Sequence, residues 1–190
     1  MIDRYTGKEM GHIFSLENKY AIWQEIEVLA CEAQAELGTT REEAAWIRAH
    51  ANFNREEVDE IEAVTNHDVI AFLTNMGSYI DADISDGEPK PSRWVHYGMT
   101  STDLGDTALC YQLTQCDILI RRVQSCAKIC KQRAFEERDT LCVGRTHGIH
   151  AEPMTFGMKF GSWAWELKRD LDRLRDARKN VAYGAISGAV

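Results

Sequence analysis

The feature that most limits the fold of this chain is a heptad pattern in its second half. Eight apolar or small residues recur at spacings of four and three: Leu109, Leu113, Cys116, Ile120, Val123, Ala127, Cys130 and Ala134. Such a pattern predicts one helix whose seam packs against other long helices. From Asp106 to Glu136, at ~1.5 Å per residue, this helix would span roughly 45 Å. It is too long to bury its seam within a compact domain of 190 residues.

A second long helix is predicted after Pro153, on the apolar series Phe156, Phe160, Trp163, Leu167, Leu171 and Leu174. Residues 168–179 alternate acidic and basic side chains, which is typical of a face in contact with solvent. Two long helices alone make a poor core. We therefore expect partner helices from more of the chain, from other subunits or from both.

Shorter helices are predicted in the first half. One runs from about Ser15 to Leu37. Others begin at Thr40, near Asn54 and after Asp68, and the first two carry a glutamate three residues later, as in a capping box. No strand-like alternation competes with these helices.

The predicted fold class is therefore all-α. A break at 85–92 contains two of the three prolines and precedes the long helices. We expect a short-helix N-terminal domain at 1–104, followed by the first part of a long-helix bundle domain at 105–190.

Composition excludes several classes of function. A net charge of −8 argues against a surface that binds nucleic acid. No apolar run is long enough to cross a bilayer, and the first residues do not begin a secretory signal. None of the six cysteines forms a C-x-x-C pair. We expect reduced thiols in a cytoplasmic protein without a nucleic-acid or membrane partner.

Polar residues gather where the predicted helices stop. In the segment 65–68, Asn66 or Asp68 would cap the next helix, or His67 and Asp68 would bind an anion or orient a catalytic group. The tetrapeptide by itself favours the cap.

Three hydroxyl residues, Thr100, Ser101 and Thr102, lead into the first long helix. Hydroxyls and backbone N–H groups at a helix N-terminus can hold a carboxylate or a phosphate. The alternative is a simple N-cap by Thr102, Asp103 or Asp106.

A third cluster is the segment 144–153, which holds His147, His150 and Glu152. Two histidines beside a glutamate could ligate a metal, but Gly148 and Pro153 disrupt the helix that such a motif needs. We expect no metal site. Glycines on both sides of Thr146-His147 instead suggest tightly packed backbone around a presented imidazole, and His147 or His150 can serve as general acid or base.

The two ends of the chain carry weaker signals. Arg4 and Tyr5 could hold a phosphate, although a chain terminus is usually mobile. The apolar ending at 184–190 suggests that the chain is a piece of a longer one.

Taken together, these segments resemble the fumarase/aspartase superfamily and, within it, the adenylosuccinate lyase family. The resemblance covers essentially the whole chain and lies in Met1-Ile2-Asp3-Arg4-Tyr5, Thr65-Asn66-His67-Asp68-Val69, the segment 96–103 and Gly144-Arg145-Thr146-His147-Gly148-Ile149-His150-Ala151-Glu152-Pro153. It implies an enzyme that releases fumarate from purine-pathway substrates. It also implies a homotetramer built on a bundle of long helices, in which each active site draws on three subunits.

The resemblance also implies roles for individual residues. His147 would be the general acid, and Thr146 would line the same site. The remaining implied contacts are with substrate, at Arg4 and Tyr5 (phosphate), Thr100 and Ser101 (succinyl group), and Asn66, His67 and Asp68, with His67 near the phosphate. The family uses no metal or organic cofactor.

The serine base of this family, with a lysine and an asparagine that bind substrate, lies beyond residue 190. We therefore expect the 190-residue chain alone to show no turnover. Two alternatives remain open: another fumarate-releasing enzyme such as argininosuccinate lyase, which would have no use for Arg4-Tyr5 as a phosphate anchor, and a non-catalytic helical oligomerisation module.

Overall fold

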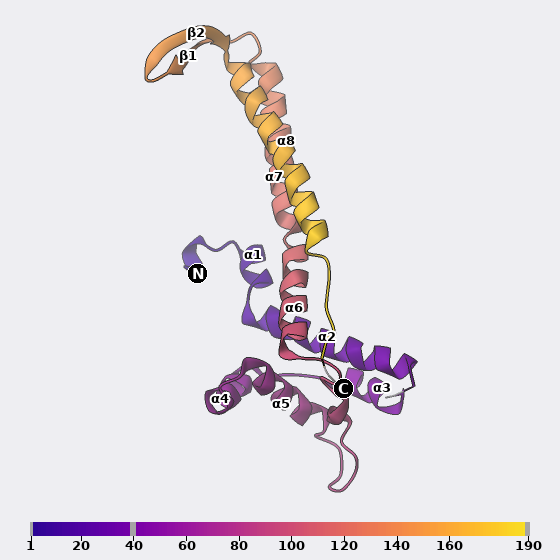
Figure 1. Cartoon of the computed structure of the whole chain (residues 1–190). Helices are drawn as coiled ribbons and strands as arrows, with labels where there is room; N and C mark the ends of the chain where they lie inside the picture. Colours follow the sequence, from indigo (N-terminus) through magenta and orange to yellow (C-terminus); the bar gives the residue numbers. More distant parts are fainter. Residues whose placement is uncertain (1, 39–40, 189–190) are drawn as a thin grey trace. The chain divides into compact units, whose positions relative to one another are not determined.

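The computed structural model of the chain describes residues 2–38 and 41–188 (Figure 1). The elements, in chain order, are η1 (Asp3–Tyr5), α1 (Lys8–Ile13), α2 (Leu16–Glu36), α3 (Arg41–His50), α4 (Arg55–Thr65), α5 (Asp68–Ile80), η2 (Pro91–Trp94), α6 (Ser101–Gln115), α7 (Asp117–Glu136), β1 (Leu141–Thr146), β2 (Ile149–Thr155) and α8 (Phe156–Asn180). The all-α class is confirmed, with one two-stranded sheet added. None of the described helices has the length and apolar character that a membrane span requires.

The chain divides into two compact units. One comprises Met1–Leu113 together with Tyr183–Val190, and the other comprises Thr114–Ala182. The domain boundary expected after residue 104 stays a prediction about the natural protein.

The helix starts in the first unit follow the predicted caps. Ser15 Oγ accepts a hydrogen bond from Asn18 N (3.1 Å) at the start of α2. Asn54 Oδ1 accepts one from Glu57 N (3.1 Å) at the start of α4. The helix start predicted at Thr40 lies outside the described residues, and α3 begins at Arg41. Local capping signals therefore located these helices correctly.

Aromatic side chains form the centre of the first unit's core. Tyr20 stacks on Phe72 with ring centroids 5.4 Å apart, and Trp23 meets Phe72 edge-on at 5.5 Å. The largest fully buried apolar side chains come from α2, α3, α5 and the first turn of α6: Trp23, Ile47, Phe72, Met76, Ile80 and Leu104. This packing fixes the N-termini of α5 and α6, where the polar clusters lie.

The single long helix expected over 106–136 is wrong. The structure has two helices, α6 and α7, which are separated at Cys116. Cys116 has φ −69° and ψ 16°, and its carbonyl accepts from Leu119 N three residues later, so the helix tightens into a 3₁₀-like turn there.

The expected seam is not packed on α6 within the described part of this chain, so its partner there stays a prediction. Leu109 and Leu113 are exposed, whereas Leu104, Ala108 and Gln112 are buried. A straight helix repeats every 3.6 residues, so the face that packs drifts away from a strict heptad unless the helix supercoils. Within this chain the seam is packed only where a second long helix accompanies it.

The second unit is such a pair, in which α7 and α8 lie side by side (Figure 1). The predicted seam residues of α7 are all half-buried: Ile120, Val123, Ala127, Cys130 and Ala134. On α8, Trp163 was predicted to lie on the packed face but is exposed, and Ala164 is half-buried in its place. The packed face continues from Phe160 by a step of four residues and not three.

Contacts at both ends show that α7 and α8 are antiparallel. At one end Gly157 N donates to Glu137 O (2.9 Å) and Phe156 N donates to Thr140 O (2.8 Å). At the other end Arg178 Nε lies 2.5 Å from Asp117 Oδ1. Most of the charges in 168–179 are exposed, as the alternating pattern predicted.

The expectation of no strands is wrong at 141–155. There β1 and β2 pair as an antiparallel hairpin, with Thr146 opposite Ile149 and an irregular register between Val143 and Arg145. The two strands are stabilised by the hydrogen bonds between them and do not show an alternating pattern in sequence. The turn sequence is His-Gly and not Asn-Gly, which is the commoner signal of a hairpin. A search for alternating residues therefore misses this hairpin.

Candidate functional site

The junction between α4 and α5 shapes the first polar cluster. Asn66 ends α4 in the left-handed conformation (φ 54°), and its N–H donates to Glu62 O. His67, rather than Asn66 or Asp68, is the N-cap of α5, since its Nδ1 accepts from Ile70 N at 3.3 Å. A ring whose Nδ1 accepts carries its proton on Nε2 when it is neutral. The cap and the functional interpretation are therefore compatible, because they use different nitrogens of one ring.

The other nitrogen of His67 faces the start of α6. His67 Nε2 lies 3.5 Å from Ser101 Oγ, and Ser101 is the first residue of α6. Two helix N-termini, each with partial positive charge, therefore meet here with an imidazole and a hydroxyl between them. Such an arrangement suits a carboxylate or a phosphate.

Asp68 has a partner that the sequence does not reveal. Lys19 Nζ lies 3.1 Å from Asp68 Oδ2 and 4.2 Å from the centre of the Trp23 ring. Lys19 therefore compensates the negative charge of the carboxylate next to His67. Lys19 and Asp68 are 49 residues apart, so no local spacing points to the pair.

Asp103 is buried at the third position of α6 and reaches back to the residue before the helix. Its Oδ2 accepts from Thr100 N (2.9 Å) and from Ser187 N (2.9 Å), and its Oδ1 accepts from Ser187 Oγ (2.7 Å). Hydrogen bonds from the backbone and hydroxyl of Ser187 lower the pKa of Asp103. The bond to Thr100 is half of a capping box, which the Thr-x-x-Asp spacing could have indicated; Ser187 could not have been foreseen.

A buried ion pair supports the turn that precedes α6. Glu27 is fully buried; its Oε2 accepts from His96 N (2.8 Å) and its Oε1 lies 2.7 Å from His96 Nδ1. The hydrogen bond from His96 to Glu27 raises the pKa of the imidazole. His96 also has φ 63°, an uncommon conformation for a non-glycine residue. The turn is thus held by a charged contact across 69 residues of chain.

Arg4 and Tyr5 belong to the exposed η1 turn. The Arg4 guanidinium lies 4.8 Å from the Tyr5 ring centre. The segment that follows is anchored at Ile13, whose carbonyl accepts from both Gln112 Nε2 (2.6 Å) and Asn18 Nδ2 (2.8 Å). No hydrogen bond or ion pair within the described part of the chain joins Arg4 or Tyr5 to His67 or Ser101.

His147 lies at the tip of the hairpin in the second unit. His147 (φ 49°) and Gly148 (φ 73°) are the two central residues of the turn, and positive φ at both defines a type I′ turn. Gly148 is needed for this conformation, whereas Gly144 allows close packing, since a Cβ there would lie 3.0 Å from Glu152 O. The turn exposes the imidazole and places Thr146 beside it as the last residue of β1.

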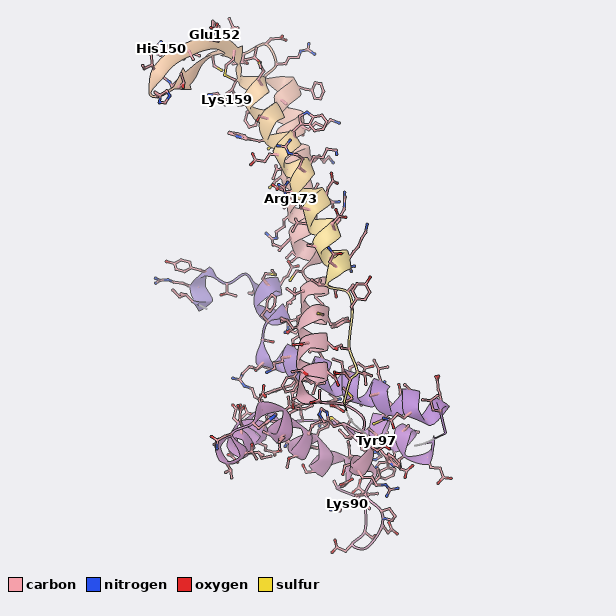
Figure 2. All side chains as sticks on the ribbon, viewed as in Figure 1. Lys90, Tyr97, His150, Glu152, Lys159 and Arg173 are labelled. Carbon is pink, nitrogen blue, oxygen red and sulfur yellow. The ribbon has the colours of Figure 1, made fainter. Side chains whose placement is uncertain are left out.

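The other candidate ligands of the hairpin are on β2, where Figure 2 labels His150 and Glu152. Both are exposed. Across residues 2–38 and 41–188, no three His, Cys, Asp or Glu side chains form a group suited to hold a metal ion.

Solved structures share this helical architecture. A fumarate lyase from Mesorhizobium sp. BNC1 matches 95% of this chain and 42% of its own, with TM-score 0.86 and 28% identity. The 3-carboxy-cis,cis-muconate lactonizing enzyme from Pseudomonas putida matches 100% of this chain and 44% of its own, with TM-score 0.89 and 28% identity. The fold is therefore that of a class of helical lyases and related enzymes.

The family model described as "Lyase" matches residues 4–190, and the chain therefore belongs to this lyase family. Three curated relatives are adenylosuccinate lyases. The one from Bacillus subtilis (strain 168) is 45% identical, the one from Streptococcus mutans 44%, and the one from Staphylococcus saprophyticus 42%, each over 100% of this chain. The chain spans 43% of the length of each relative.

Proposed function

We propose that this protein is an adenylosuccinate lyase. It eliminates fumarate from adenylosuccinate to give AMP, and from SAICAR to give AICAR, in purine biosynthesis. The observation that carries this proposal is the 45% identity to the Bacillus subtilis adenylosuccinate lyase over the whole of this chain. Because the chain spans 43% of that relative, the activity is assigned to the protein at the full length of its relatives.

The proposed reaction is an elimination. A base removes a proton from the carbon beside a carboxylate, the carbon–nitrogen bond breaks, and an acid protonates the departing nitrogen. His147 is the proposed acid, because an imidazole can carry a transferable proton near neutral pH. Its exposure at the hairpin tip, with Thr146 beside it, is compatible with contact to substrate.

The meeting of the α5 and α6 N-termini is the proposed anion-binding part of the site. Removal of the proton leaves an extra negative charge next to the succinyl carboxylates, and preorganised donors stabilise that charge. Thr100 and Ser101 supply hydroxyl donors and Ser101 also a backbone N–H, while the His67 Nε2–H supplies another donor toward the phosphate. Asn66 and Asp68 complete this side of the site.

Arg4 and Tyr5 are proposed to hold the substrate phosphate. Both side chains are exposed on η1, and a guanidinium fork with a phenol suits a phosphate oxygen. No metal or organic cofactor takes part in the proposed reaction.

The proposed assembly is a cytoplasmic homotetramer whose active sites are shared between subunits. It is supported by the large apolar side chains that the α7–α8 unit exposes beyond its own seam: Leu119, Ile129, Phe135, Met158, Trp163 and Trp165. Burial of such side chains between long helices would supply the partners that the heptad pattern calls for.

The experiment that tests the function uses the protein at the full length of its relatives. Purified protein is mixed with adenylosuccinate, and fumarate release is followed. Release supports the proposal. No release from a folded oligomer contradicts it, and argininosuccinate is then the next substrate to try. The 190-residue chain by itself is expected to release no fumarate.

Replacement of the hairpin histidines decides which one is the acid. Asparagine tolerates positive φ, so His147→Asn should keep the turn while removing the proton donor. We expect its kcat to fall by roughly 10²–10⁴-fold, with an unchanged melting temperature. His150→Asn is the matched variant on the same hairpin, and a larger loss of kcat in that variant would transfer the role to His150.

A further inference from the structure

We propose that Asp103 is a positioning residue for the succinyl-binding end of the site. It holds the first turn of α6 against the segment 184–188, so that Thr100 and Ser101 keep a fixed orientation toward the substrate. The inference rests on the proposed function, because it takes the succinyl group as the ligand of Thr100 and Ser101.

The carboxylate of Asp103 is held by protein donors. It accepts from Thr100 N, Ser187 N and Ser187 Oγ at 2.7–2.9 Å. Since Asp103 is only 2% exposed, its carboxylate is closed to a ligand. Asp103 can therefore act on substrate only through the residues that it holds.

The segment held by Asp103 packs closely on backbone and side chains of the same unit. A Cβ on Gly188 would lie 2.6 Å from Met99 O and 2.7 Å from Met99 Cα. A Cβ on Gly184 would lie 2.9 Å from Thr107 Cγ2, and Ala185 N donates to Thr107 Oγ1 at 3.1 Å. The segment therefore meets the start of α6 at Met99, Asp103 and Thr107. Of these contacts, only the one through Asp103 also includes Thr100.

This geometry decides which donors are left for a bound carboxylate. Because Thr100 N–H is committed to Asp103, the available donors are the hydroxyls of Thr100 and Ser101 and the first free N–H groups of α6. Three protein donors disperse the negative charge of the Asp103 carboxylate, which would otherwise repel an anionic ligand nearby. Loss of the bond to Thr100 N would release the turn that carries Thr100 and Ser101.

The test compares inhibition by the two products in the full-length enzyme. Asp103→Asn places an amide donor against N–H and O–H donors and breaks the arrangement. We expect the inhibition constant of fumarate to rise about tenfold or more, as the loss of one charge-assisted hydrogen bond implies, while that of AMP stays unchanged. Ser187→Ala removes one of the three bonds, the one from Ser187 Oγ, and should raise the fumarate inhibition constant by less.

Thr107→Val is the matched control. It removes the other side-chain contact to the same segment without touching Thr100, so both inhibition constants should stay at the parent values. If Asp103→Asn and Ser187→Ala leave the fumarate constant unchanged, or raise both constants equally, the positioning role is refuted. If Thr107→Val raised the fumarate inhibition constant as much as Asp103→Asn does, Asp103 would only hold the segment 184–188 in place, and the positioning role would also be refuted.

A second measurement separates this inference from the proposed function. Amide hydrogen exchange at Thr100 should be slow in the parent and faster in Asp103→Asn. If the parent releases no fumarate, the proposed function fails, and this exchange still reports whether Asp103 holds the turn. Unchanged exchange at Thr100 would overturn the inference whatever the activity.

Discussion

Replacement of Gly157 by alanine should destabilise the α7–α8 pair, although alanine is the better helix former. A Cβ on Gly157 would lie 2.8 Å from Arg138 Cα and 2.9 Å from Arg138 N, and closer still to Ala134 O. All three are backbone atoms at the C-terminal end of α7, so no flexible side chain can move aside. Overpacking of this kind costs up to about 3 kcal/mol, and the helix propensity of alanine returns about 1 kcal/mol.

Gly157→Ala should therefore lower the free energy of unfolding by about 2 kcal/mol, which is the overpacking cost minus the gain in helix propensity. For a chain of this size that corresponds to a fall in Tm of about 4–8 °C. The assay is thermal unfolding followed by circular dichroism at the helical band.

Gly161→Ala is the matched control in the same helix. No atom lies within 4 Å of a Cβ built there, so only the propensity gain remains, and Tm should rise by about 2–4 °C. The reasoning would be refuted if Gly157→Ala melted at or above the parent temperature.

Three further predictions concern local features. Gly148→Ala should cost about 1–2 kcal/mol, because alanine is strained at φ 73°, and loss of amide protection in the hairpin would show it. Asn54→Ala should lower the urea unfolding free energy by about 1 kcal/mol, since the α4 cap is lost. Glu27 raises the pKa of His96, so their pairing contributes fully below the ordinary histidine pKa of 6.5 and is lost as pH rises through the higher folded value. The unfolding free energy should therefore fall as the pH rises above 6.5 and through the raised pKa of His96. A fall of the same size in Glu27→Gln would contradict this assignment.

Features that depend on neighbouring residues were predictable from the sequence. The starts of α2 and α4 follow from Ser15 and Asn54, because a cap is made within three residues of chain. The α7 seam follows from the heptad, because one helix presents every third or fourth residue on one face. On α6 the core of the first unit decides which face is buried in this chain, and the partner of Leu109 and Leu113 stays a prediction.

Within the candidate site, the sequence located polar residues but not their partners. His67 and Ser101 were found because they stand at helix starts, and His147 because glycines lie on both sides of it, although its segment is a hairpin turn and not a helix end. Their functional roles stay predictions.

The sequence by itself determined where most helices begin, which residues of α7 face α8, and which polar clusters stand at helix ends. Only the tertiary structure decided the pairs Lys19–Asp68, Glu27–His96 and Asp103–Ser187, which are separated by 49, 69 and 84 residues. The β1–β2 hairpin belongs with them, since each strand needs the other. The physical reason is that capping and helix periodicity act over one or two turns, whereas a buried charge finds its partner only when the core brings distant segments together.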